Sequence, residues 1–249
     1  MDISVKTIKK LHEKKHRREM GLFLVEGETS VAEVIRSSFE VMHVFCTKEF
    51  FGEYSSVFSK SRIPVTYLEA DEITRIGTLE ANRSAIAVAK QKSLDSSPSG
   101  AGMILALDDI RDPGNLGTII RIADWFGVSH IVASRETADF YNSKTIAASM
   151  GSFARVLFSY IDLPVFLEGV QVPVLGAFLD GSDVHSFSFP KSGILVIGNE
   201  SHGISETVSK LVSDRVTIPS YGGAESLNAG IAAAVILDNW RRIAPLVAK

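Results

Sequence analysis

The chain of 249 residues contains very little cysteine, no long hydrophobic run and no large excess of either charge. Its single cysteine, Cys46, rules out an intrachain disulfide and a cysteine-rich zinc cluster, and the apolar run VMHVFC around it indicates a buried thiol. No stretch of about 18 or more apolar residues occurs, which argues against a membrane-spanning helix. The basic N-terminal segment is not followed by the apolar core of a secretory signal. These absences favour a cytoplasmic protein.

Signatures of several enzyme classes are missing as well. A G-x-x-x-x-G-K-[ST] phosphate loop, a G-x-G-x-x-G turn between a strand and a helix, and a G-x-S-x-G elbow do not occur. We therefore do not expect a P-loop nucleotide hydrolase, a dinucleotide-dependent oxidoreductase or a serine hydrolase of the usual kind. The histidines and the one cysteine of the chain lead us to predict no metal site.

The net charge is −3, yet basic residues gather near the N-terminus. Between Lys6 and Arg18 only Glu13 opposes the cations, so a phosphate polymer would be attracted to this segment despite the negative total. A solvated helix face is the alternative interpretation, because charge runs are commonly just that. The cations that we expect to contact nucleic acid are Lys14, Lys15, Arg17 and Arg18.

A small, polar stretch at 93–102 (SLDSSPSGAG) divides the chain and predicts an exposed linker. Before it, residues 1–92 alternate helix and strand patterns, which predicts a compact α/β domain. A basic helix is expected to begin with a cap at Ser4 and to stop at Gly21. The other elements expected in this half are a helix at 30–39 and strands at 22–25, 41–46, 64–68 and 85–90.

Residues 103–249 alternate helices with strands rich in Val, Ile and Leu, which predicts a parallel sheet covered on both faces. The ligand site of such a sheet lies in the loops that follow the carboxyl ends of its strands. The expected strands are 103–110, 130–134, 172–179, 193–198 and 215–219, and the expected helices are 116–127 and 143–153.

Two segments after expected strands have the composition of site loops. DDIRDPGNLGTIIR (108–121) places Asn115 in a turn and Arg121 one to two helical turns later. VIGNESHGIS (196–205) brings Glu200 out of a strand and ahead of a second glycine turn. Each side chain also has a plain structural interpretation, as a turn residue, a surface cation or a helix cap.

A third segment, IPSYGGAESLNAGIAAAV (218–235), runs from a strand end through a Gly-Gly turn into a run of small residues. Ser226 and Asn228 stand where the loop becomes a helix, whose free N–H groups bind and orient polar groups. A helix that is merely capped and packed on a sheet would show the same residues. The three loops are more informative together than singly.

Together, the elements N-L-G-x-x-x-R (Asn115 to Arg121), I-G-N-E-x-x-G-I (Ile197 to Ile204) and I-P…E-S-L-N (Ile218 to Asn228) resemble the three motifs of the SpoU family. The proteins of this family are AdoMet-dependent RNA ribose 2′-O-methyltransferases with the SPOUT fold. The resemblance covers 103–249, and three ordered motifs make it specific. Residues 1–90 look like the L30e-like RNA-binding domain that often precedes this catalytic domain.

The resemblance implies a deep trefoil knot in the second domain and a homodimer whose active sites use both subunits. It also implies S-adenosyl-L-methionine (AdoMet) as the cofactor, RNA as the substrate and no metal. The residues that it places in the catalytic site are Asn115, Arg121, Glu200, Ser226 and Asn228. The residues that it places around AdoMet are Gly198, Ile218 and Leu227.

Because AdoMet carries an electrophilic methyl group, the protein must chiefly align the ribose 2′-oxygen and remove its proton. Holding reactants in line supplies roughly 7–11 kcal/mol of the barrier. Ser226 and Asn228 would provide orienting hydrogen bonds. Arg121 is a hydrogen-bond donor only, so we expect it to bind the adjacent phosphate and stabilise the developing alkoxide. Glu200 is expected to orient Arg121 or another donor.

We predict an α/β protein with an L30e-like RNA-binding domain at 1–92, a linker at 93–102 and a SPOUT methyltransferase domain at 103–249. It would methylate a ribose 2′-hydroxyl in structured RNA, with 23S-type ribosomal RNA preferred because of the separate L30e-like domain. The alternatives are a tRNA 2′-O-methyltransferase, a knotted enzyme that methylates a base nitrogen, and a catalytically silent RNA-binding or assembly protein of the same fold. The sequence identifies neither the target nucleotide nor its base.

Overall fold

In a computed structural model of the protein, the described residues are 3–59, 61–95, 98 and 102–245, and they form two compact units. One unit comprises Met1–Ser93 together with Asp139–Arg155, and the other comprises Leu94–Ala138 and Val156–Lys249. The predicted linker at 93–102 includes 96–97 and 99–101, which lie outside the described residues. The domain boundaries predicted above stay a prediction.

The first unit is built on a mixed four-stranded sheet in the order β1-β4-β2-β3. Strand β4 pairs antiparallel with β1 and β2, whereas β3 pairs parallel with β2. All four predicted strands form: β1 Leu22–Glu26, β2 Val41–Cys46, β3 Val65–Tyr67 and β4 Ala85–Lys90. The helices of this unit are α1 Val5–Leu11, α2 Lys14–Met20, α3 Glu28–Arg36, α4 Lys48–Glu53, α5 Ser55–Phe58, α6 Ala70–Ile76, α8 Ser143–Ala148 and the 3₁₀ helix η1 Ser152–Ala154. Cys46 is buried, as predicted, and burial raises the pKa of its thiol to about 11.

The basic helix predicted between Ser4 and Gly21 is wrong as a single element, although both predicted caps are in place. The chain becomes extended at Glu13, with φ −93° and ψ 133°, and so separates α1 from α2. Arg17 of α2 explains the break. Its Nη1 donates to the carbonyl oxygens of Leu11 and His12 at 3.1 and 2.9 Å, which satisfies free carbonyls at the end of α1.

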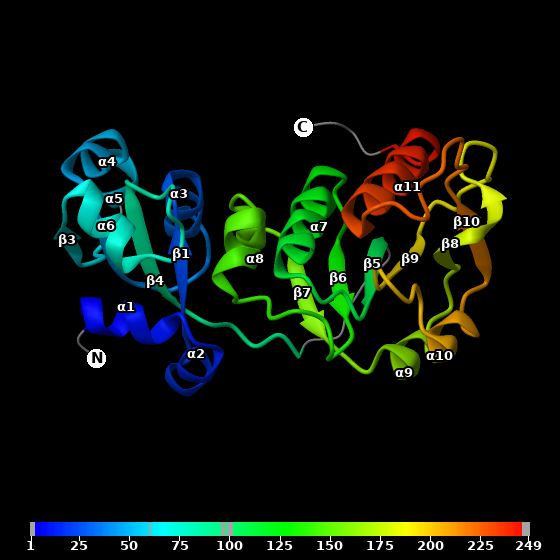
Figure 1. Ribbon diagram of the computed structural model, residues 1–249, viewed down its shortest axis with the longest axis horizontal. Helices are drawn as coiled ribbons and strands as arrows, with labels where there is room; N and C mark the ends of the chain where they lie inside the picture. The colour runs from blue at the N-terminus through cyan, green and yellow to red at the C-terminus, as the bar shows by residue number, and fades with distance from the viewer. Residues whose placement is uncertain (1–2, 60, 96–97, 99–101, 246–249) are drawn as a thin grey trace. The chain divides into compact units, whose positions relative to one another are not determined.

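The second unit contains a six-stranded sheet in the order β10-β8-β9-β5-β6-β7, in which every neighbouring pair is parallel (Figure 1). The predicted parallel sheet is therefore confirmed. Its strands are β5 Met103–Asp108, β6 His130–Ala133, β7 Leu157–Tyr160, β8 Val174–Asp183, β9 Gly193–Gly198 and β10 Asp214–Thr217. Its helices are α7 Pro113–Trp125, α9 Leu163–Glu168, α10 Glu206–Ser209 and α11 Ala229–Ile243. The sequence did not predict β7 or α9.

Helices cover both faces of this sheet. On one face, Leu167 of α9 and Val208 of α10 share a buried cluster with Ile104 and Ile194 of the central strands. Side chains alternate along a strand, so the next residue of each strand points to the opposite face. There α11 packs on α7, β8 and β9, and Trp240 of α11 is fully buried. Within the part of the chain that the structure describes, no helix is both long and apolar enough to cross a membrane.

Asp139–Arg155 follows β6 in the sequence but belongs to the first unit, where α8 packs on β1. The helix predicted here is interrupted, because Met150 and Gly151 adopt left-handed backbone angles, with φ of 49° and 89°. The Tyr141 ring anchors the segment, with its centroid 4.6 Å from that of Phe23 in β1. The spacing of apolar residues predicts helices and strands but not which domain they join, so the sequence did not predict that 139–155 would pack with the first unit.

Candidate active site

The three loops singled out in the sequence meet at the carboxyl edge of the parallel sheet. Strands β5 and β9 are neighbours that end in register, with Asp108 opposite Gly198, so the loops before α7 and α10 start side by side. The third loop, residues 218–228, leads from β10 into α11, which packs against α7. Strand pairing and helix packing thus bring together segments that are far apart in the sequence.

Two hydrogen bonds join side chains from all three loops. Asn115 Nδ2 donates to Glu200 Oε1 at 2.6 Å, and Asn228 Nδ2 donates to Asn115 Oδ1 at 2.8 Å. An ionised carboxylate only accepts hydrogen bonds, so Glu200 fixes the direction of the Asn115 amide, which in turn fixes that of Asn228. We name Glu200, Asn115 and Asn228 the amide relay.

Helix N-termini hold both asparagines of the relay in place. Asp112 caps α7, and its side chain accepts from the backbone N–H of Asn115 at 2.9 Å. Asn228 caps α11, and its Oδ1 accepts from the N–H groups of Gly230 and Ile231 at 2.9 and 3.3 Å. Asn228 is therefore both a helix cap and a relay member, because its oxygen accepts from the N–H groups of the helix and its NH₂ group donates to Asn115.

A tight loop after β9 holds Glu200. Asn199 and Gly203 exchange two backbone hydrogen bonds at 3.0 and 2.9 Å, and Gly203 has a φ of 70°. Asn199 Oδ1 also accepts from the N–H groups of residues 201–202, at 2.8 and 3.2 Å. A Cβ at Gly198 would overlap the backbone of Gly203, so the loop closes only over glycine at this position.

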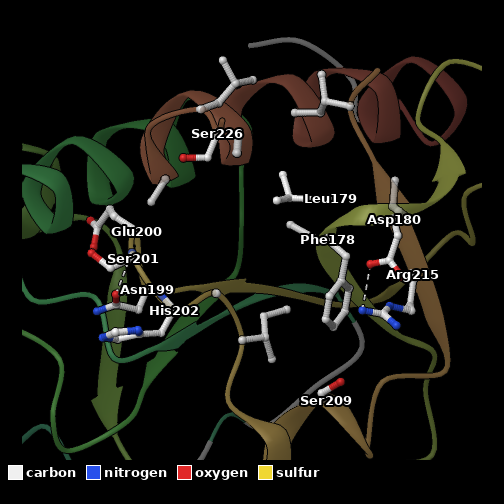
Figure 2. A pocket seen from close by; sticks show the side chains of 18 of the residues that line it. Phe178, Leu179, Asp180, Asn199, Glu200, Ser201, His202, Ser209, Arg215 and Ser226 are labelled. Carbon is white, nitrogen blue, oxygen red and sulfur yellow. Dashed lines mark hydrogen bonds and ion pairs between the residues drawn. The ribbon is translucent and has the colours of Figure 1, made fainter. Parts of the chain in front are cut away.

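A cavity of about 890 Å³ opens beside Glu200, the carboxylate of the relay (Figure 2). Its walls come from β8 and β10, from the loops that follow β9 and β10, and from helices α10 and α11. Its size falls within the range of about 300–1,000 Å³ that small-molecule sites occupy. Apolar and acidic side chains share the lining: Phe178, Ile218, Leu227 and Ile236, with Asp180, Glu200, Glu206 and Glu225. Four residues predicted from the sequence are therefore on its wall, namely Glu200, Ser226, Ile218 and Leu227.

The side of the cavity opposite Glu200 carries a group that the sequence did not predict (Figure 2). The guanidinium carbon of Arg215 lies 3.8 Å from the centroid of the Phe178 ring, a cation–π contact. Arg215 Nη2 also pairs with Asp180 at 3.0 Å. These residues come from the paired strands β8 and β10 and belong to no motif. Phe178 lies in the middle of β8 and Arg215 near the start of β10, so the rule that sites lie at the carboxyl ends of strands did not point to them either.

Arg121 stands apart from the amide relay. It lies on α7 with an exposed side chain, and in the described part of the chain no hydrogen bond or ion pair holds it. Glu200 was expected to orient Arg121 or another donor, and the donor that it contacts is Asn115. The guanidinium of Arg121 is consequently available to a ligand that arrives from solvent.

The cations predicted to contact RNA divide into two groups. Lys14, Lys15 and Arg18 are exposed on α2. Arg17 requires a correction, because only 3% of its side chain is exposed and its Nη2 pairs with Asp139 at 2.8 Å. Its Nη1 is occupied by the end of α1. Arg17 therefore stabilises the first unit and is not part of a surface that RNA could reach.

The segment from His12 to His16 (HEKKH) has the H-E-x-x-H spacing of a zinc-binding helix, a signal that runs against the prediction of no metal site. That motif requires both imidazoles on one helix, and here the break between α1 and α2 separates them. His12 Nε2 lies 3.1 Å from the carbonyl oxygen of Ile76, and His16 Nδ1 lies 3.1 Å from Glu19 Oε2. Among the described residues, no group of three or more His, Cys, Asp or Glu side chains could hold a metal ion.

Comparison with known families and proteins assigns both parts of the chain. Residues 102–238 match the model of the SpoU rRNA Methylase family, and residues 3–87 match an MRM3-like substrate binding domain. The chain is 31% identical over 243 residues to the 23S rRNA (guanosine(2553)-2′-O)-methyltransferase RlmP of Bacillus subtilis, with 95% of each chain covered.

Solved structures agree with this assignment. A putative RNA methyltransferase of the TrmH family from Porphyromonas gingivalis is 34% identical, with a TM-score of 0.85 over 97% of this chain and 99% of that one. The AdoMet-bound rRNA methyltransferase from Sinorhizobium meliloti is 28% identical, with a TM-score of 0.82 over 96% and 94% of the two chains. The family match spans more than half of the chain and contains all three motif loops. The chain belongs to the SpoU rRNA methylase family.

Proposed function

We propose that this protein transfers a methyl group from AdoMet to a ribose 2′-hydroxyl of structured RNA, with 23S-type ribosomal RNA as the substrate class. The observation that carries the proposal is the amide relay, which ties the three motif loops together beside a cavity of about 890 Å³. The Bacillus subtilis relative is named for this reaction on 23S rRNA, and the family match is to rRNA methylases.

The cavity suits AdoMet in size and in chemistry. Ile218 and Leu227 offer apolar surface for the adenine ring, with Gly198 at the base of the loop above β9. Carboxylates on the wall, Glu225 among them, suit a ligand that carries a sulfonium charge. When bound, AdoMet supplies an activated methyl group on a positively charged sulfur. The Sinorhizobium meliloti relative was solved with AdoMet bound, which supports this choice of cofactor.

The amide relay would hold the ribose in line with that methyl group. Each asparagine of the relay uses one N–H within it, so Asn115 and Asn228 each keep a second N–H for a ligand. Because Glu200 and the two helix N-termini fix these amides, the donors are oriented before RNA binds. Ser226 adds a hydroxyl at the cavity wall.

Arg121 would bind the phosphate next to the target ribose. A guanidinium binds phosphate through two parallel hydrogen bonds, and the exposed side chain of Arg121 has no competing partner among the described residues. The same charge would stabilise negative charge that develops on the 2′-oxygen.

The first unit would supply most of the affinity for RNA. Its residues 3–87 match a substrate binding domain, and α2 exposes Lys14, Lys15 and Arg18 together. Contacts of lysine and arginine with phosphates set affinity and register without reading sequence. Binding should therefore weaken as salt rises.

A homodimer is part of the proposal, as is a trefoil knot in residues 103–249, for which the support is the family resemblance. Trp125 at the end of α7 is 85% exposed, and Ile231 on the neighbouring α11 is 51% exposed. Large apolar side chains exposed on two packed helices are typical of a protein contact. Trp125 lies one helical turn from Arg121, so a contact through this face would carry Arg121 to a site shared with the partner. Light scattering should give twice the mass of one chain.

The test of the function is methyl transfer with the purified protein. Ribosomal RNA from cells that lack the gene is incubated with AdoMet labelled on its methyl group, and the RNA is then digested with alkali. A 2′-O-methyl group blocks cleavage at its own nucleotide, so the label should remain in an alkali-resistant dinucleotide. Label released in mononucleotides would show base methylation and contradict the proposal. Transfer to tRNA in place of rRNA would overturn the substrate class.

A further inference from the structure

Glu200 lies on the cavity wall, and only one of its two carboxylate oxygens accepts a hydrogen bond within the described residues. Its Oε1 accepts from Asn115 Nδ2 at 2.6 Å. In the described part of the chain, Glu200 makes no second hydrogen bond and no ion pair, with Arg121 or with any other cation. The Oε2 atom of this cavity-lining residue is therefore without a partner among the described residues.

The other members of the site cannot take a proton. Asn228 Oδ1 is occupied by the start of α11, and Asn115 Oδ1 is occupied by Asn228. What the two asparagines have left are N–H donors, which can hold a hydroxyl but not deprotonate it. Arg121 is likewise a donor only, and the Ser226 hydroxyl is too weak a base without a partner to activate it.

Other titratable groups on the cavity wall are less suited to the task. Glu206 is paired with Lys210 at 2.7 Å, and Asp180 is paired with Arg215 at 3.0 Å. The His202 ring points away from Ser226 in Figure 2. Glu225 also lines the wall, but among the described residues it has no hydrogen bond to the relay, so Glu200 is the wall carboxylate that is joined through the relay to both asparagines.

We propose that Glu200 Oε2 accepts the proton of the ribose 2′-hydroxyl, an inference that rests on the proposed function. The 2′-oxygen forms its bond to the methyl carbon as its O–H bond breaks and the proton passes to Oε2. The bond between that carbon and sulfur breaks with its electron pair left on sulfur, which neutralises the sulfonium charge. Glu200 then returns the proton to solvent. Asn115 and Asn228 hold the 2′-hydroxyl, and Glu200 supplies the base.

Glu200→Gln tests this with a change at a single position of the side chain. The Gln oxygen can still accept from Asn115, so the relay survives, while an NH₂ group replaces Oε2 and cannot take a proton. General bases contribute about 10²–10⁴-fold to rate, so the single-turnover rate should fall by about 100-fold or more. The control is Glu168→Gln, the same change at an exposed carboxylate on α9, which should leave the rate unchanged.

Glu200→Asp separates a base from a residue that only orients Asn115. Orientation depends on side-chain length, so an orienting role predicts that the Gln variant is faster than the Asp variant. Proton transfer depends on the carboxylate, so our proposal predicts that the Asp variant is faster. The opposite order, or a Gln variant within about threefold of the unmodified protein, would overturn the proposal.

Calorimetric binding of AdoMet and of S-adenosylhomocysteine gives a readout besides activity. The two ligands differ by the methyl group and by the positive charge on sulfur. We expect Glu200→Gln to bind both within threefold of the unmodified protein, which would also show that the variant is folded. Selective loss of AdoMet binding, with a normal rate at saturating AdoMet, would assign Glu200 to the sulfonium charge and overturn the proposal. Failure of the proposed function is distinct, because the unmodified protein would then transfer no methyl group to a ribose.

Discussion

The N-terminal helices and the carboxyl edge of the parallel sheet differ in how distance along the chain relates to distance in the fold. In the first unit, the fold separates a continuous basic run, burying Arg17 against Asp139 and leaving Arg18 exposed. In the second unit, the fold joins residues that are far apart in the chain, so that Asn115 and Asn228 share a hydrogen bond. Proximity in sequence is therefore a poor guide to shared function, whereas position after parallel strands is a good one.

The largest expected effect separates the two arginines of the first unit. Arg17→Met removes one partner of a buried ion pair and leaves Asp139 without its cation, which should lower the free energy of unfolding by about 3–5 kcal/mol. Arg18→Met makes the same change on the exposed side of α2 and should cost less than about 0.5 kcal/mol. Urea denaturation of both variants measures the difference. Equal unfolding midpoints would contradict the division of the basic run.

The next effect concerns the amide relay. Asn115→Asp keeps the shape of the side chain but replaces the NH₂ donor with an oxygen that faces Glu200. Two carboxylates then repel, and the orientation of Asn228 is lost. Because loss of one oriented donor costs about 10²–10³-fold in rate, we expect a fall of that order in single-turnover methyl transfer. A variant with an unchanged rate would show that the relay is only structural.

Arg121→Lys tests the cation that stands outside the relay. Lysine keeps the charge but loses the planar fork that grips a phosphate through two hydrogen bonds. We expect methyl transfer to slow by about 10–100-fold, or about 1.4–2.8 kcal/mol at about 1.4 kcal/mol per factor of ten, while calorimetry shows unchanged AdoMet binding. Near-normal transfer by this variant would contradict the role assigned to Arg121.

The smallest effect is on RNA affinity. Changing Lys14, Lys15 and Arg18 together to Ala should weaken RNA binding and reduce the slope of log affinity against log salt by about 2–3, because each phosphate contact contributes about 0.7–0.9. Filter binding at several salt concentrations measures the slope. As a comparison, a triple change of Lys48, Glu49 and Glu53 to Ala on α4 should leave it unchanged. If the triple variant keeps the slope of the unmodified protein, the exposed cations of α2 do not contact RNA and form a solvated face.

Much of this architecture could be predicted because buried strands carry a strong local signal. The strand at 85–90 was predicted to the residue, since an apolar run of that length in a sheet interior needs no long-range information. The parallel sheet followed from alternating helices and strands. The three site loops were predicted from motif residues, and their meeting at one edge follows from parallel topology.

The rest depends on contacts that a local pattern does not contain. The break at Glu13 exists because Arg17 reaches back to the carbonyls of α1, and the burial of Arg17 depends on Asp139, which is 122 residues away. The Phe178–Arg215 contact joins two paired strands that carry no motif. In each case, the partner that decides the outcome comes from a distant part of the chain.

Methylation of a ribose in ribosomal RNA is tested most directly by mapping 2′-O-methyl groups in cells with and without the gene. We predict that one ribose mark in 23S-type rRNA disappears without the gene. It should return when the gene is restored, but not when the restored copy carries Asn115→Asp. Identical ribose maps of rRNA in the two strains would contradict rRNA methylation by this protein, whether or not a tRNA mark changed.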